Sequence, residues 1–116
     1  MEKDNSHRRI IAHRTYALDD RAGAVTITMF APEPLDGGRD WRCPYRIDGL
    51  EQGWDSHACG VDPLQALTLA LKKIAIELYV SPEAREGRLT WLQQGRGDLG
   101  LPMPDGMEEW YRDEAR

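Results

Sequence analysis

Apolar and polar residues alternate with a period of two through the first half of the chain, as in β-strands that bury one face. Residues 24–30 show this most clearly, because Val25, Ile27 and Met29 alternate with threonines. A turn-forming run at residues 19–23 precedes them and predicts a hairpin. The alternation predicts four strands, at residues 9–18, 24–30, 41–48 and 53–59.

The apolar period changes to three and four residues after Asp62, which is typical of a helix with one buried face. Asp62 is a natural N-cap, Pro63 suits the first helical position, and Gln65 has the spacing of a capping box. The predicted helix runs from Pro63 to about Tyr79. Its predicted buried stripe is Leu64, Leu67, Leu71, Ile74 and Leu78, widened by Ala66, Leu69 and Ala70. Its predicted solvent-exposed side carries Lys72, Lys73 and Glu77.

This order of elements predicts an α+β fold: an antiparallel β-meander of about four strands, one long helix packed on one face, and an irregular C-terminal tail. At 116 residues the chain is expected to form a single domain, residues 1–116. Residues 1–8 are expected to be a flexible N-terminus, and residues 93–116 a loop with a short acidic tail helix. Pro44 cannot donate to a strand ladder, so we expect it at a sheet edge or a bulge.

Charge and composition narrow the function. Twenty acidic residues against 15 basic ones give a net charge of −5, which argues against nucleic acid and favours a basic partner. The N-terminus lacks the apolar core of a signal peptide, and no apolar run is long enough to span a bilayer. We therefore expect a cytoplasmic protein without membrane contact, with its two cysteines reduced.

Candidate chemistry is sparse. Cys43, His57 and Cys59 are the one plausible metal-binding trio or thiol–imidazole pair, but they lack the spacing of known zinc sites and sit in no catalytic motif. Residues 95–100 are rich in glycine yet lack the lysine and hydroxyl residue of a phosphate-binding loop. The sequence thus predicts no catalytic residue, no bound metal and no cofactor.

Two acidic clusters beside tryptophans are the candidate partner-binding residues, since exposed tryptophan and complementary charge are common at interfaces. The alternative is a solvated turn for the first cluster and a tail pinned to the core for the second. The first cluster is Asp48, Glu51, Trp54 and Asp55, and the second is Glu108, Glu109, Trp110 and Asp113.

Two stretches resemble a family of small uncharacterised bacterial domains. Residues 41–49 read W-R-C-P-Y-R-I-D-G and match a W-x-C-x-Y-x-I-x-G strand, while residues 60–67 read G-V-D-P-L-Q-A-L and match a G-V-D-S-L-Q-A-L helix start. Pro63 replaces the usual serine, and residues 99–102 also resemble the family's ending. The resemblance implies the same fold and a bacterial cytoplasmic origin, and it implies no catalytic residues.

The sequence therefore favours a non-catalytic protein-binding domain. Its most specific form is an immunity or antitoxin-like inhibitor that occludes a basic bacterial toxin domain. The alternative is a self-associating structural or accessory module, such as a homodimer that pairs through an edge strand near Pro44 or an exposed helix face. A small enzyme or metal protein using Cys43, His57 and Cys59 is the third hypothesis.

Overall fold

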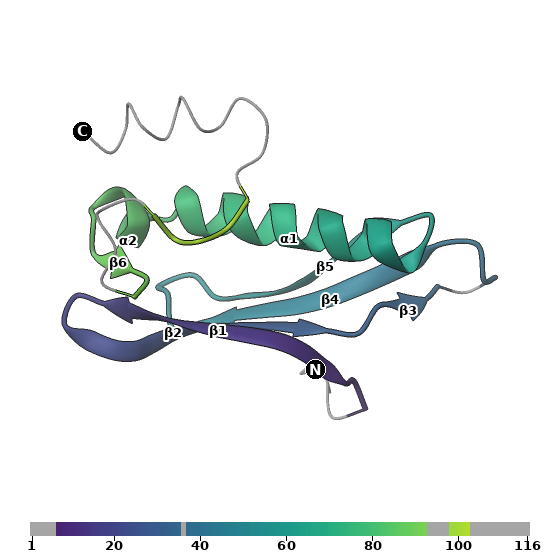
Figure 1. Cartoon of the computed structure of the whole chain (residues 1–116), viewed down its shortest axis with the longest axis horizontal. Helices are drawn as coiled ribbons and strands as arrows, with labels where there is room; N and C mark the ends of the chain where they lie inside the picture. Colours follow the sequence, from purple (N-terminus) through teal and green to yellow (C-terminus); the bar gives the residue numbers. More distant parts are fainter. Residues whose placement is uncertain (1–6, 36, 93–97, 103–116) are drawn as a thin grey trace.

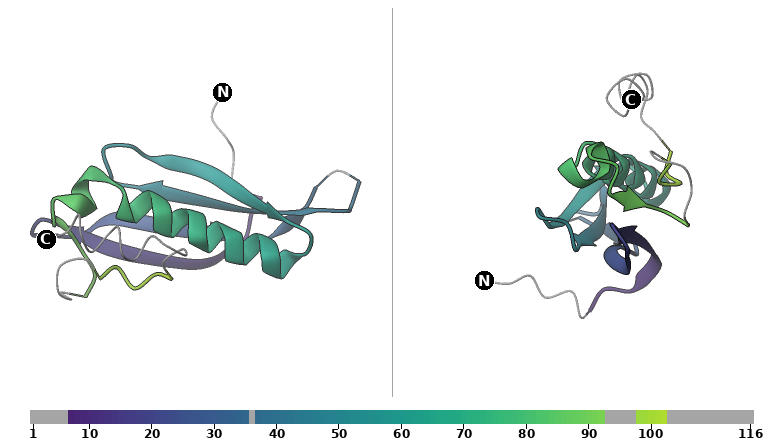
Figure 2. Two further views of the ribbon diagram at one scale, coloured as in Figure 1. Left: turned by 90° about the horizontal axis from the view of Figure 1, so that it is seen from above. Right: turned by 90° about the vertical axis from the view of Figure 1, so that its left-hand side faces the viewer.

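An antiparallel sheet and one long helix form two layers in the computed structural model, which describes residues 7–35, 37–92 and 98–102 (Figure 1). Helix α1 lies lengthwise across one face of the sheet, and a short helix α2 follows it (Figure 2). The four main strands are β1 (Ile10–Leu18), β2 (Arg21–Phe30), β4 (Trp41–Asp48) and β5 (Trp54–Gly60). The remaining elements are β3 (Glu33–Pro34), α1 (Pro63–Tyr79), α2 (Pro82–Arg85) and β6 (Leu89–Thr90).

The α+β class and the meander are confirmed, but the described part of the chain has six strands rather than about four. The two additional strands have two residues each, too few to show a period. Strand β3 lies between the predicted strands at residues 24–30 and 41–48, and β6 pairs with the end of β1 through Leu18 and Leu89. Such long-range pairing leaves no local signal in the sequence.

Strand β4 is an interior strand of the described sheet. It pairs with β2 and β3 along one side and with β5 along the other. Pro44 therefore does not lie on an edge strand. It faces the place where the register shifts by one residue, between the pairs Met29–Tyr45 and Glu33–Arg42, and this corresponds to the expected bulge.

Helix α1 begins as its sequence indicates. The Asp62 carboxylate accepts a hydrogen bond from the Gln65 amide at 2.7 Å, and the Gln65 side chain accepts one from the Val61 amide at 2.8 Å. This reciprocal pair is a capping box moved back by one residue. Gly60, just before the cap, lies so close to the helix that a Cβ there would come within 3.0 Å of the Ala66 backbone.

The buried face of α1 is rotated relative to the predicted stripe. Leu64 is 73% exposed and Leu69 is partly exposed, whereas Glu77 lies half-buried rather than on the solvent side. Three of the six buried residues are alanines, and these let the helix approach β4 and β5 closely. The buried residues of α1 are Ala66, Ala70, Ile74, Ala75, Leu78 and Tyr79.

A segment at the end of the described chain packs back onto the first strand. Leu99 is fully buried, and its carbonyl accepts hydrogen bonds from Tyr16 at 2.9 Å and from Arg14 at 3.3 Å. Arg14, which interrupts the apolar face of the predicted first strand, also stacks its guanidinium 4.3 Å from the centre of the Trp91 ring. Its charge thus serves to hold residues 98–102 in place.

We predict that Gly49→Ala lowers the free energy of unfolding by at least about 2 kcal/mol. Gly49 has φ +103°, and a Cβ would collide with the Ala24 carbonyl oxygen. Urea denaturation measures the loss. Gly53→Ala in the same turn is the matched control, because its Cβ would meet only the Ile47 carbonyl oxygen, at 3.5 Å. Equal losses for the two variants would contradict the role assigned to Gly49.

Candidate functional site

A pocket of about 310 Å³ opens where the turn between β4 and β5 meets the junction of α1 and α2. It combines apolar walls with several polar groups that converge on one place, which is the usual composition of a binding site. Its lining residues are Leu50, Glu51, Gln52, Trp54, Glu77, Val80, Ser81, Pro82 and Glu83.

The local sequence dictates the shape of this junction. Val80 ends α1, and the Ser81 hydroxyl then caps α2 by accepting from the Ala84 amide at 3.2 Å. The same hydroxyl donates to the Leu78 carbonyl at 2.7 Å, so its one proton is already used. Pro82 stands at the first position of α2, where its missing N–H has no consequence. The chain turns sharply here and carries Glu83 under the β4–β5 turn.

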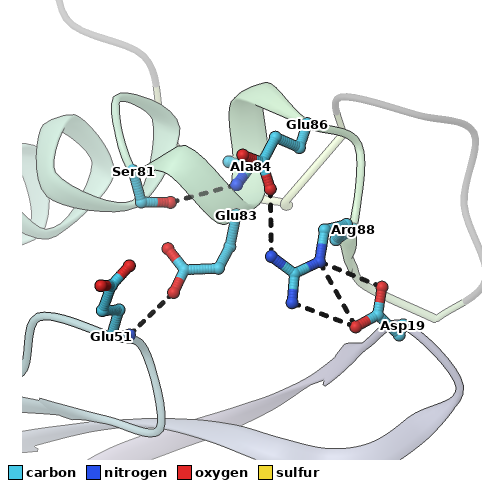
Figure 3. Close-up of polar contacts among 7 residues, drawn as sticks. All are labelled: Asp19, Glu51, Ser81, Glu83, Ala84, Glu86 and Arg88. Atoms are coloured by element: carbon cyan, nitrogen blue, oxygen red, sulfur yellow. Dashed lines mark hydrogen bonds and ion pairs between the residues drawn. The ribbon is translucent and has the colours of Figure 1, made fainter.

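Glu83 is the most unusual residue of the pocket. Its side chain is only 4% exposed, and one carboxylate oxygen accepts a hydrogen bond from the Glu51 amide at 2.7 Å. The other oxygen, Oε1, is buried and has no hydrogen-bond partner among the described residues. Figure 3 shows this oxygen turned toward the side of Ser81 and Glu51, away from Arg88. A buried carboxylate oxygen without a partner is costly, so it calls for a functional explanation.

Glu77 is the second carboxylate of the pocket, and it is half-buried. Its two oxygens lie 2.8 and 3.0 Å from the Tyr45 hydroxyl, which donates to the carboxylate from β4. Burial raises the pKa of Glu77, and this effect exceeds the opposite effects of the Tyr45 hydrogen bond and of Lys73. Burial and the Glu77 charge also raise the pKa of Tyr45, so the tyrosine remains a donor.

No Lys or Arg belongs to the described residues that line the pocket, although Lys73 acts on Glu77 from outside it. The Lys73 ammonium donates to the His57 carbonyl at 2.7 Å. On the outer side of α2, Arg88 binds Asp19 at 3.1 Å and Glu86 at 3.0 Å, which lowers the pKa of Asp19 (Figure 3). The pocket therefore presents the carboxylates of Glu51, Glu77 and Glu83 without a basic side chain among its described lining residues.

The structure divides the first predicted acidic cluster between two places. Glu51 and Trp54 line the pocket. Asp48 follows the buried Ile47 in β4, and Asp55 follows Trp54, the register partner of Ile47, in β5. Because side chains alternate along a strand, both aspartates lie on the open face of the sheet. Arg46 lies between these two aspartates, with an ion pair of 3.2 Å to Asp48 and register pairing to Asp55. The second predicted cluster, Glu108, Glu109, Trp110 and Asp113, lies outside the described residues.

Sequence reasoning missed Glu77 and Glu83. Glu77 follows the buried Ile74 by three residues, a spacing that places it at the margin of the buried face, and this was a usable signal. Glu83 gives no such signal, because its burial depends on the β4–β5 turn, which lies 32 residues earlier in the chain.

The proposed trio of Cys43, His57 and Cys59 does not come together. Cys43 pairs with Ala58 in the β4–β5 ladder, so the residues on either side of Ala58 point to the opposite face of the sheet. Burial raises the pKa of the Cys43 thiol to about 11, which keeps it protonated at neutral pH and unreactive. No group of three or more His, Cys, Asp or Glu is placed to hold a metal within the described ranges.

Comparison with known proteins places the chain in a family. A model of the family described as Domain of unknown function (DUF6968) matches residues 12–103. The chain belongs to this family. The matched range of the DUF6968 domain contains every residue of the pocket. No curated protein and no solved structure matches the chain. Among the described helices of this DUF6968 domain, none has the length and apolar character needed to cross a membrane.

We predict that Glu77→Gln becomes progressively more stable than the wild type as pH rises. The raised pKa of Glu77 means that the native state holds this proton more tightly than the unfolded state does. Its contribution is therefore fully present below the unfolded value near 4.5 and is lost as pH rises through the native pKa. Glutamine stays neutral and can still accept from Tyr45. Urea denaturation across this range measures the difference.

The variant Tyr45→Phe provides the matched check on this assignment. It removes the hydrogen bond that favours the charged form of Glu77, so it should make the loss of stability with rising pH steeper. A stability difference between Glu77→Gln and wild type that stays constant with pH would show that Glu77 is not the group concerned.

Proposed function

We propose that this chain is a non-catalytic protein-binding domain that holds a basic partner at the acidic pocket. The observation that carries the proposal is the pocket itself, where Glu51, Glu77 and Glu83 surround the Trp54 wall without a cation among the described lining residues. Carboxylates in a concave, partly desolvated site attract a cation more strongly than carboxylates on an open surface. The net charge of −5 adds attraction at longer range.

The most specific form of the proposal is an immunity or antitoxin-like inhibitor of a basic bacterial toxin domain, acting in the cytoplasm. Domains that attack nucleic acids carry basic clefts, which an acidic surface can occlude. A rigid sheet with its site on a turn and a helix junction suits such a role, because binding then requires little reordering. Both the toxin partner and the bacterial setting are part of the proposal.

The alternative, self-association, has two grounds. The first is an edge strand near Pro44: Pro44 itself lies in β4, but its register partner His57 belongs to β5, which pairs only with β4 in the described sheet. The exposed Val61 and Leu64 at the start of α1 remain as the second ground.

The proposal predicts one basic protein, in about equal molar amount, bound to tagged wild-type chain in an extract of the organism that encodes it. Mass spectrometry identifies the retained protein, and its loss at high salt shows the electrostatic origin of binding. Glu51→Lys should weaken binding at least about tenfold, because it places a cation in the pocket mouth. Asp48→Lys is the matched control, since Asp48 lies on the open face of the sheet.

Three outcomes would decide against the proposal in different ways. Recovery of the chain alone, as a dimer, would favour self-association. Equal loss with Asp48→Lys and Glu51→Lys would place the interface elsewhere. For the inhibitor form, co-expression of the chain must restore growth to cells that express the captured partner, and a partner that is harmless to cells would overturn that form.

A further inference from the structure

The pocket contains hydrogen-bond acceptors that lack a full set of donors among the described residues. Glu83 Oε1 is buried and without a partner among the described residues, although Ser81 lies only two residues before it in the chain. Ser81 cannot help, because its proton goes to the Leu78 carbonyl. Glu77 offers two oxygens to the single proton of Tyr45. A ligand that completes this set must bring several donors and a positive charge.

The positions of the free acceptors distinguish between the two basic side chains. Arginine binds a carboxylate best as a planar fork that engages both oxygens of one group. Glu83 has only one oxygen left, since the Glu51 amide occupies the other. The Tyr45 hydroxyl already lies between the two Glu77 oxygens, where a fork would bind, so Glu77 retains acceptor sites only for single donors. A primary ammonium carries three donors that can reach separate acceptors on different elements.

We propose that the pocket is the seat of one lysine side chain of the partner, an inference that rests on the proposed function. The ammonium donates to Glu83 Oε1 and to the Glu77 carboxylate. The methylene stem lies along the apolar wall that Leu50, Trp54 and Val80 form at the pocket. The Trp54 ring adds attraction for the cation.

The experiment uses n-butylammonium as the probe, because it reproduces the lysine side chain from Cβ to Nζ. Titration into the full-length chain is followed by NMR at the Trp54 indole N–H and the Glu51 amide. We expect saturable shifts at both. Butyltrimethylammonium has the same charge but no N–H, and n-butylguanidinium has the planar fork, so each should bind at least about tenfold more weakly.

Variants test which groups make the seat. Glu83→Gln should weaken n-butylammonium binding at least about tenfold, because its amide can keep the Glu51 hydrogen bond while placing a donor where Oε1 lies. Glu77→Gln is the second variant, with the Tyr45 contact preserved. Asp48→Asn, on the open face of the sheet, is the control and should bind as wild type does. Thermal unfolding confirms that each variant is folded.

Absence of saturable shifts, or equal binding of the ammonium and trimethylammonium probes, would overturn the lysine seat. Retained affinity in both Glu83→Gln and Glu77→Gln would do the same. The proposed function fails separately. If a partner binds and depends on Glu51 but tolerates Glu83→Gln, the protein-binding function stands and the lysine seat is wrong. If the ammonium probe binds and no partner is captured, the seat stands and the protein-binding function loses its support.

Discussion

The close approach of α1 to β4 and β5 is the constraint on which the rest of the structure depends. Ala66, Ala70 and Ala75 have no exposed surface, and Gly60 leaves no room for a side chain beneath the helix. Small residues on both sides allow this spacing, and tight packing then fixes the position of the helix along the sheet. Because the helix is fixed at its beginning, its far end places Glu77 beside Tyr45. The same end places α2 against the turn that follows β4. The pocket is a consequence of that packing.

Most of the fold could be predicted from the sequence because the patterns that indicate it are local. The alternation in β2 and β4 and the Asp62 cap of α1 each occupy a few consecutive residues, and all three predictions are confirmed. The errors arose where helix rotation decides burial. The predicted stripe has the correct period, and its Ala66, Ala70, Ile74 and Leu78 are buried. Its Leu64 and Leu69 are exposed, however, and Ala75 and Tyr79 are buried in their place. A periodicity gives the width of a buried face more reliably than its centre.

The candidate site was only half predictable for a related reason. Glu51 and Trp54 could be recognised in the sequence, because a charged residue and a tryptophan lie together on a predicted turn, and both line the pocket. Asp48 and Asp55 have the same charge, but strand alternation sends them to the open face of the sheet. Glu83 becomes unusual only through tertiary burial. A carboxylate is common in the first turn of a helix, and the sequence contains nothing that distinguishes this one from a solvated one.

The two carboxylates together indicate that this junction is not arranged for stability alone. Burial raises the pKa of Glu77, and Glu83 keeps one oxygen buried without a partner among the described residues. Both features make the folded state less favourable than neutral residues of the same shape would. Neither belongs to the hydrophobic core, which contains their helix neighbours Leu78 and Ala84 instead. Groups that oppose folding are retained where another molecule completes their interactions. At this pocket the missing interaction is a hydrogen-bond donor beside a positive charge, and under the proposed function a basic partner supplies both.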